Sequence, residues 1–232
     1  MYHSIQDIID ICNEENMEFW EVVQRTDMDE RAASSAESWT NMANIYQAMK
    51  DADKSYNARL RSASGLAGGD GEKLGFTDEQ MIHAMYVSAS VGAIIAENAS
   101  IAGASGGCQA EIGSASAMAA AGLVSLQGGT VENIAHGAAL ALKNMLGLAC
   151  DPVCGLVEVP CVKRNVAGAV NAVTAAQMAM AGIVSAIPVD EVIDTMRRIG
   201  NAMPESLKET AGGGLATTPT AALIAQRFQK CE

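Results

Sequence analysis

The chain has 232 residues, of which 18% are charged and 4% aromatic, and its formal net charge is -12 at pH 7. This length is enough for a substantial hydrophobic core, and the negative charge argues against nucleic acid or an anionic membrane surface as a partner. The first residues contain no basic segment and no long apolar run, so we expect no signal peptide and a cytoplasmic protein.

The N-terminal region is predicted to be helical. Ser4 can cap a first helix that has Asp7 in its first turn and Ile5, Ile8, Ile9 and Cys12 on one face. A second helix is expected over 17–25, and a longer one from about Asp29 with an inner stripe of Ala32, Ala36, Trp39, Ala43 and Tyr46. We therefore assign 1–61 to an N-terminal helical region, followed by a glycine-rich linker over 62–76.

The remaining residues, 77–232, are rich in Ala and Gly and predict an all-α domain with buried central helices. Thr77 with Gln80 forms a capping box, and Thr130 marks the start of another helix. A loop around Cys108 should lead into a helix of small residues that ends at Gly128. Further helices are expected over 164–186 and directly after Pro188. No segment shows convincing strand alternation.

Two uncharged runs, 112–131 and 165–189, are long enough to cross a bilayer. The first consists mostly of Ala, Ser and Gly, and the second contains Asn165, Asn171, Thr174 and Gln177. Neither has the density of Leu, Ile and Phe that favours insertion, so we expect buried helices and no membrane partner.

Three of the six cysteines lie within "CDPVCGLVEVPCVKRN", residues 150–165. In a chain without a signal peptide, metal or redox chemistry is a better expectation than a disulfide framework. The spacing of Cys150, Cys154 and Cys161 matches neither a zinc pair nor a ferredoxin run, so buried structural cysteines remain equally possible. Cys108, in the glycine-rich "GASGGCQAE", precedes a helix whose N-terminus favours a thiolate or another anion. Cysteines at three loop–helix junctions could converge on one point.

Three longer motifs carry a resemblance: "IAENASIAGASGGCQAEIGSASAMAAAGL", "ALKNMLGLACDPVCGLVEVPCVKRN" and "ETAGGGLATTPT". From about Ile94 to Thr220 the chain resembles the alpha chain of iron-sulfur-dependent L-serine dehydratase, also called L-serine ammonia-lyase. The resemblance implies a [4Fe-4S] cluster held by Cys108, Cys150 and Cys161, with Cys154 as a non-ligand and no pyridoxal phosphate. One iron without a thiolate would act as a Lewis acid on the substrate hydroxyl, and L-serine would become pyruvate and ammonia.

Other residues near these motifs are candidates for the site. Lys163 and Arg164 could hold the substrate carboxylate or neutralise the cluster, although a solvated helix start explains them equally well. Asn98 and Ser100, with Glu97, could line the site. The remaining candidates are expected to have supporting roles: Glu111 beside the ligands, His136 and Cys12 in the core, and Cys231 as an exposed thiol rather than an iron ligand.

The resemblance also implies a beta chain that completes the active site around a small amino-acid substrate. Relatives of this family have a loop resembling A-P-T-x-G-x-x-G before the "AENAS" helix, whereas here Leu74 leads almost directly into "GFTDEQ". We therefore expect an internal deletion after about Leu74. The alternatives are a shortened, non-catalytic cluster-binding scaffold, or a related lyase that acts on cysteine.

Overall fold

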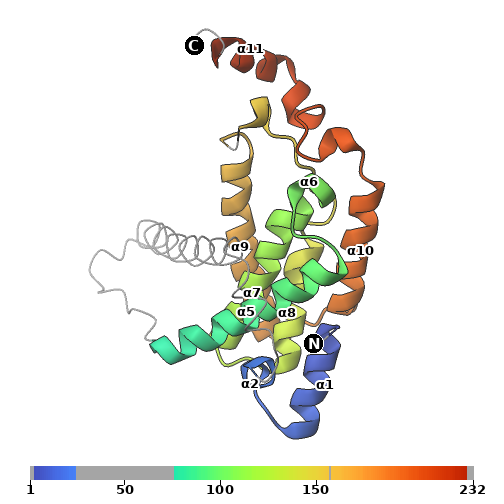
Figure 1. Cartoon of the computed structure of the whole chain (residues 1–232). Helices are drawn as coiled ribbons and strands as arrows, with labels where there is room; N and C mark the ends of the chain where they lie inside the picture. The colour runs from blue at the N-terminus through green and yellow to red at the C-terminus, as the bar shows by residue number, and fades with distance from the viewer. Residues whose placement is uncertain (1–2, 25–75, 157, 229–232) are drawn as a thin grey trace, which may run out of the picture.

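The computed structural model describes residues 3–24, 76–156 and 158–228, and these residues form an all-α fold (Figure 1). Its centre is α7 (Ser114–Leu126), which packs against α5 (Asp78–Asn98), α8 (Val131–Lys143) and α9 (Cys161–Met180). Within the described residues there is no strand, and the only bridge is an isolated parallel one between Cys150 and Lys208. The expected all-α class with buried central helices is confirmed.

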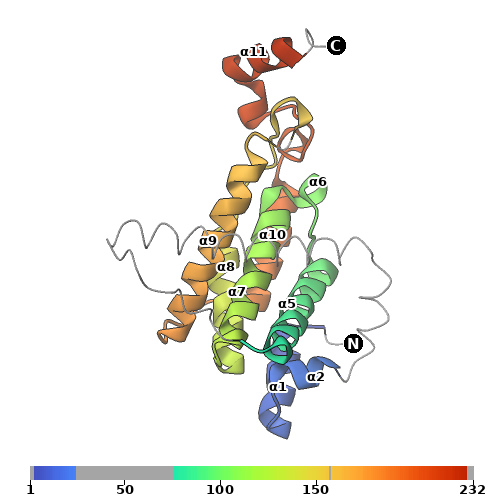
Figure 2. The same ribbon diagram turned by 90° about the vertical axis from the view of Figure 1, so that its left-hand side faces the viewer.

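The N-terminal helices pack at one end of this bundle, opposite to the C-terminal helix (Figure 2). Helix α1 (Ile5–Glu15) begins with a capping box between Ser4 and Asp7 and buries the four residues expected from the pattern, Ile5, Ile8, Ile9 and Cys12. Helix α2 (Phe19–Gln24) begins two residues later than expected. The helix expected from Asp29 and almost all of the linker lie outside the described residues.

Side-chain caps fix the starts of two bundle helices as expected. The side chains of Thr77 and Thr130 accept hydrogen bonds from the backbone N–H groups of Gln80 and Asn133. The side-chain oxygens of Gln80 and Asn133 in turn accept from the backbone N–H groups of Thr77 and Thr130. Helix α7 carries mostly Ala, Gly and Ser and is buried along most of its length. Such small side chains let three neighbouring helices approach it closely, which explains how a chain with few aromatic residues forms a packed core.

The expected bounds of α9 are wrong at both ends. The helix begins at Cys161, directly after Pro160, and ends at Met180 rather than Ala186. Gly182 lies in the left-handed region with φ 80°, and its N–H donates to Ala179 O while that of Ile183 donates to Met178 O. This pattern is a Schellman motif, which ends a helix even where the following residues are apolar.

After this turn the chain enters α10 (Val189–Ala202), which begins after Pro188 as expected. Short elements follow: 3-10 turns η3 (Glu205–Leu207) and η4 (Gly214–Thr217), and then α11 (Pro219–Phe228). None of the helices in the described residues combines the length and the hydropathy that a bilayer-spanning segment needs.

The segment around Cys108 is more ordered than a loop. It forms a short helix, α6 (Gly103–Gly106), and then a π-helix, η1 (Gln109–Gly113), which continues directly into α7. The second cysteine region contains a 3-10 turn, η2 (Val153–Gly155). Helix α9 leaves four valines substantially exposed along one face: Val162, Val166, Val170 and Val173.

Candidate metal centre

Two thiols and one carboxylate converge where α6, η1 and the segment before η2 meet. The sulfur atoms of Cys108 and Cys150 and a carboxylate oxygen of Glu111 all lie within 4.8 Å of one another. Both cysteines are buried, whereas the Glu111 side chain remains accessible to solvent. Thiolates and a carboxylate at this separation are a donor set suited to a transition-metal ion or an iron-sulfur centre.

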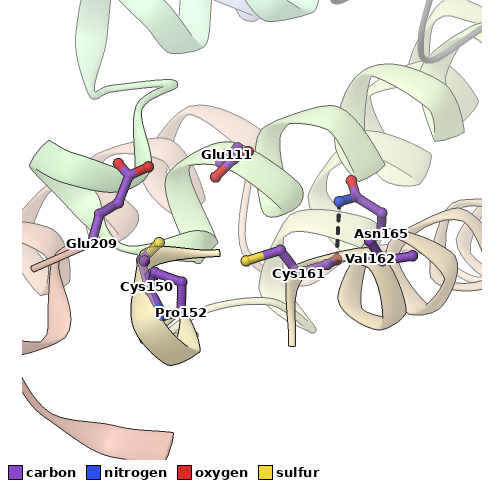
Figure 3. Close-up of a pocket in the computed structure, with 8 residues that line it drawn as sticks. Glu111, Cys150, Pro152, Cys161, Val162, Asn165 and Glu209 are labelled. Carbon is purple, nitrogen blue, oxygen red and sulfur yellow. Dashed lines mark hydrogen bonds between the residues drawn. The ribbon is translucent and has the colours of Figure 1, made fainter. Parts of the chain in front are cut away.

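Cys161 faces the same space from the first residue of α9. A cavity of about 250 Å³ is lined by Cys150, Cys161 and Glu111, together with Pro152, Gly155, Val162, Asn165 and Glu209. Figure 3 shows the sulfur atoms of Cys150 and Cys161 and the carboxylate of Glu111 turned toward this shared space. Cys161 is nevertheless not part of the closer group formed by Cys108, Glu111 and Cys150.

The backbone at Cys108 is held by a glycine that no other residue would replace easily. Gly107 has φ 76°, and a Cβ added there would lie 2.9 Å from Leu148 O and 2.7 Å from the sulfur of Met203. Gln109 N donates to Leu148 O at 2.9 Å. In the buried side chain of Gln109, Nε2 donates to Met196 O and Oε1 accepts from Gly147 N. These contacts anchor η1 between α10 and the chain just before Cys150.

Cys150 is held by backbone pairing with the segment after η3. Its N–H donates to Leu207 O at 2.8 Å, and its own carbonyl accepts from Glu209 N at 2.8 Å. Glu209 itself is in the left-handed region, with φ 64°. The pairing brings the Glu209 carboxylate to the rim of the cavity, 59 positions along the chain from the cysteine that holds it.

Arg164 is clamped beside Cys108 by a buried aspartate. Its Nη1 donates to Asp151 Oδ1 at 2.6 Å and to Ala149 O at 2.7 Å, and it lies 4.0 Å from Cys108 Sγ. The other oxygen of Asp151 accepts from Leu215 N at 2.8 Å. Asp151 therefore connects this arginine to the "GGGLATTPT" segment and places a positive charge next to the thiols.

The thiols of this site are poor acids in the metal-free chain. Burial raises the pKa of Cys108, Cys150 and Cys161 above the ordinary value, and for Cys150 and Cys161 the proximity of Cys108 acts in the same direction. Partial burial, and then the charge of Glu209, raises the pKa of Glu111. A bound cation would reverse this trend, because ligation stabilises the thiolate form. The residues present therefore fit a metal or iron-sulfur group.

The other predicted site residues, Lys163, Arg164, Asn98 and Ser100, are not among the residues that line this cavity. Lys163 donates to Glu158 O at 2.7 Å at an exposed position. The Asn98 amide donates to His3 O and Ile94 O and so ties the N-terminus to α5. Ser100 lines a second cavity, of about 160 Å³, with residues of α6, η1 and α10.

Several further expectations concern single side chains. Cys154 is exposed, has φ 58°, and belongs neither to the close group nor to the cavity lining. Cys12 is buried in the core, and His136 Nδ1 accepts from Ser185 N at 3.4 Å. Cys231 lies outside the described residues.

Sequence reasoning missed Asp151 and Glu209. The available signal was the position of Asp151 as a lone acid in an apolar stretch between two cysteines. The structure shows it buried, and a buried carboxylate needs partners. Glu209 has no local signal, since only the Cys150 pairing brings it to the cavity.

Comparison with known proteins gives consistent matches over this region. The sequence profile of the family described as "Serine dehydratase alpha chain" matches residues 70–216. A "Probable L-serine dehydratase, alpha chain" of Bacillus subtilis (strain 168) is 62% identical over 149 residues, which are 64% of this chain and 50% of that protein. An "L-serine dehydratase, alpha chain" of Peptoniphilus asaccharolyticus is 48% identical over 159 residues, 68% of this chain and 54% of that protein.

A longer type of relative matches as well. An "L-serine dehydratase" of Mycobacterium bovis (strain ATCC BAA-935 / AF2122/97) is 45% identical over 143 residues, 61% of this chain and 31% of that protein. The match therefore spans about half of the Bacillus and Peptoniphilus proteins and about a third of the Mycobacterium protein.

Proposed function

Since this chain belongs to the serine dehydratase alpha chain family, we propose that it is the cluster-binding subunit of a cytoplasmic L-serine dehydratase. The overall reaction would convert L-serine to pyruvate and ammonia. The observation that carries this proposal is the convergence of Cys108, Cys150 and Glu111 within 4.8 Å, beside a cavity that Cys161 also lines.

The three cysteines Cys108, Cys150 and Cys161 would hold a [4Fe-4S] cluster. When bound with three thiolates, such a cluster supplies an iron that can act as a Lewis acid on the serine hydroxyl. Support comes from the donor set and from the uncharged thiols, whose buried site needs a positive group to become ionised. Gly103 adds a further indication, because a Cβ there would lie 3.0 Å from Glu111 Oε2 and 3.2 Å from Cys150 Sγ.

In this proposal Arg164, which lies beside Cys108 but does not itself line the cavity, would hold the substrate carboxylate. All of its contacts to Cys108, Ala149 and Asp151 use Nη1, which leaves Nη2 and Nε without a partner among the described residues. A guanidinium with a free edge can bind a carboxylate through two parallel hydrogen bonds. Its pKa stays high because Asp151 and Cys108 outweigh the opposing effect of burial.

The remaining polar side chains take secondary roles in this proposal. The carboxylate of Glu209 at the cavity rim would attract the substrate ammonium group. Lys163 would add positive charge next to Arg164 in the chain, and Asn98 and Ser100 would support the α5–α6 connection that precedes Cys108.

A beta chain is the proposed partner. Relatives that match over about half of their length are named as alpha chains, whereas relatives named simply L-serine dehydratase are covered over less than a third. The additional length in the second group is consistent with a partner function joined to the same chain. The exposed valines of α9 begin at the cavity, where Val162 lines it, and this supports a protein contact close to the site.

The test is anaerobic purification of the full chain with a co-expressed beta chain, followed by iron analysis and an assay of pyruvate formed from L-serine. We expect about four irons per chain, and a loss of most iron when Cys108, Cys150 or Cys161 is changed to Ser. Cys154→Ser is the matched control, because its thiol lies in the same sequence cluster but outside the cavity. Equal loss of iron in Cys154→Ser would contradict the ligand assignment.

A second candidate, the non-catalytic cluster-binding scaffold, is favoured by the internal deletion expected after Leu74. Losing a substrate-positioning loop removes part of a contribution that can reach roughly 7–11 kcal/mol of a barrier. We therefore expect little pyruvate from the chain alone and only partial recovery with the beta chain. A chain with full iron and no pyruvate with its partner would favour the scaffold, and release of sulfide from L-cysteine would favour a related lyase.

A further inference from the structure

The closest donor group in the cavity region is smaller than the set required for a four-iron cluster. Cys108, Glu111 and Cys150 present two sulfur atoms and one carboxylate oxygen that lie within 4.8 Å of one another, and Cys161 is outside this group. We propose that the cluster-free chain binds a single divalent transition-metal ion, such as Zn²⁺ or Fe²⁺, through Cys108, Glu111 and Cys150.

The separation of the donor atoms is close to what one ion needs. Sulfur ligands about 2.3 Å from a tetrahedral ion lie about 3.8 Å from each other. For the two sulfur atoms the observed upper limit of 4.8 Å therefore leaves a closure of about 1 Å or less, and for each sulfur–oxygen pair about 1.3 Å or less. Side-chain rotation can supply such shifts. Water can occupy the fourth position, as it does in zinc sites with three protein ligands.

Backbone hydrogen bonds and the packing of Gly103 fix the positions of these three side chains. Cys108 is the last residue before the π-helix η1, and Glu111 projects from that helix on the same side. Cys150 is fixed by its two backbone hydrogen bonds to Leu207 and Glu209. Gly103 packs against both Glu111 and Cys150, so the group has a wall on one side and the cavity on the other.

The chemistry of the group selects the class of ion. Two thiolates exclude Mg²⁺ and Ca²⁺, which prefer oxygen ligands, and favour Zn²⁺, Fe²⁺ and Co²⁺. Binding requires the two thiols to become thiolates, so each ion that enters releases about two protons to solvent. The positive charge of Arg164 next to Cys108 is balanced by Asp151, which leaves the negative charge of the ligands available to the ion.

The consequence is that one ion and the cluster compete for the same two cysteines. A chain that holds Zn²⁺ at Cys108 and Cys150 cannot assemble the cluster until the ion leaves. The single-ion site does not depend on L-serine, on a beta chain or on the dehydratase reaction, and so it goes beyond the function proposed above.

The experiment is an anaerobic titration of the full, cluster-free chain with Co²⁺, followed by thiolate-to-cobalt charge-transfer absorption and by proton release to an indicator. We expect one ion per chain and about two protons released for each ion. Cys108→Ser, Cys150→Ser and Glu111→Gln should each weaken binding at least tenfold.

Two variants provide matched controls. Cys161→Ser removes the third cysteine of the cavity, and Glu209→Gln neutralises the other carboxylate that lines it. Cys161→Ser should leave the Co²⁺ affinity nearly unchanged. Glu209→Gln should weaken it less than Glu111→Gln does, because the charge of Glu209 acts on Glu111 without Glu209 belonging to the ligand group. If Cys161→Ser weakens binding as strongly as Cys108→Ser, or if Glu111→Gln has no larger effect than Glu209→Gln, the proposed ligand set is wrong.

A further variant keeps the test decisive if Glu111→Gln fails to fold. Gly103→Ala adds a methyl group 3.0 Å from Glu111 Oε2 and 3.2 Å from Cys150 Sγ, and it lies in a helix, where Ala is favoured. It should lower the Co²⁺ affinity, and unchanged affinity would contradict the assigned geometry. Co²⁺ binding by the cluster-free chain, together with no pyruvate from the cluster-loaded chain and its beta chain, would refute only the dehydratase proposal. Pyruvate formation by that loaded pair without Co²⁺ binding by the cluster-free chain would refute only this one.

Discussion

At the residue scale, Asp151 is expected to contribute strongly to stability because its buried carboxylate has two partners. Its carboxylate is buried and accepts from Arg164 Nη1 at 2.6 Å and from Leu215 N at 2.8 Å. Asp151→Asn replaces one acceptor by a donor, so one of these two donors loses its partner. We expect the unfolding free energy of the cluster-free chain to fall by about 2–3 kcal/mol, measured by urea denaturation.

The control for this substitution is Asp194→Asn on α10. Asp194 also pairs with arginines, Arg197 and Arg198, but all three side chains are well exposed to solvent. Exposed pairs contribute little, so this variant should unfold at nearly the same urea concentration as the original chain. Similar losses in both variants would show that burial is not what gives the Asp151 contacts their effect.

Gly107 tests how tightly the backbone before Cys108 must pack. Gly107 and Gly128 both have positive φ, 76° and 73°, but only Gly107 has atoms close to the position of an added Cβ. Gly128→Ala should therefore destabilise by about 1 kcal/mol, the cost of the left-handed conformation alone. Gly107→Ala should cost about 2–3 kcal/mol more, because the methyl group meets Leu148 O and Met203.

The two glycine variants should also differ in metal content after anaerobic purification. Gly107→Ala displaces the residue that precedes Cys108 and should reduce bound iron, whereas Gly128→Ala should not. Equal stability of the two variants in urea would mean that the chain near Cys108 can shift without strain.

At the element scale, the cap of α8 tests the contribution of a helix start. Thr130 accepts from Asn133 N, and Asn133 Oδ1 accepts from Thr130 N in return. Thr130→Ala removes one half of this box and should lower the unfolding free energy by about 1 kcal/mol. Thr174→Ala is the control, because that exposed hydroxyl bonds a carbonyl in the middle of α9, where its contribution is small. Comparable losses would show that the cap is not important.

The helix starts were predictable because their signals are local. Ser4, Thr77, Thr130 and Pro188 each act within one turn of the chain, and each marks a helix start in the structure. The end of α9 is not predicted by the sequence, because Gly182 is one more small residue in an uncharged run. The π-helix η1 has no composition that separates it from an α-helix, so it could not be expected from the sequence.

The site was predictable only in part, for a related reason. The position of Cys108 before a helix suggested a ligand, and the structure places this cysteine beside Cys150. The wider constellation depends on contacts between distant segments. Asp151 reaches Leu215 across 64 positions, and Glu209 is carried to the cavity by the backbone of Cys150. No periodic pattern in a single sequence contains such pairings.

At the scale of the whole molecule, buried thiols make the stability sensitive to alkaline pH. Burial, and then the charges of Glu18 and Glu132, raises the pKa of Cys12 from 9.0 to about 11. The unfolded chain therefore ionises this thiol first as the pH rises. The stabilising contribution is fully present below about pH 9 and is lost as the pH rises through about 11.

We expect the unfolding free energy to fall by about 1–2 kcal/mol more between pH 8.5 and 11 in the original chain than in Cys12→Ala. The measurement is urea denaturation at a series of pH values with a reducing agent present, and only the difference between the two pH profiles is used. Cys154→Ala removes an exposed thiol and serves as the control. Parallel profiles for the original chain and Cys12→Ala would contradict the assigned pKa.

The π-helix η1 bears on how the site can be lost or gained. An α-helix turns about 100° for each residue, so one residue more or fewer between Cys108 and Ser114 rotates everything before that point around the axis of α7. A deletion that converted η1 to an ordinary turn would leave every cysteine in the sequence but aim Cys108 away from Cys150. A change of one residue in length, rather than the replacement of any ligand, would therefore be enough to disperse the proposed metal ligands.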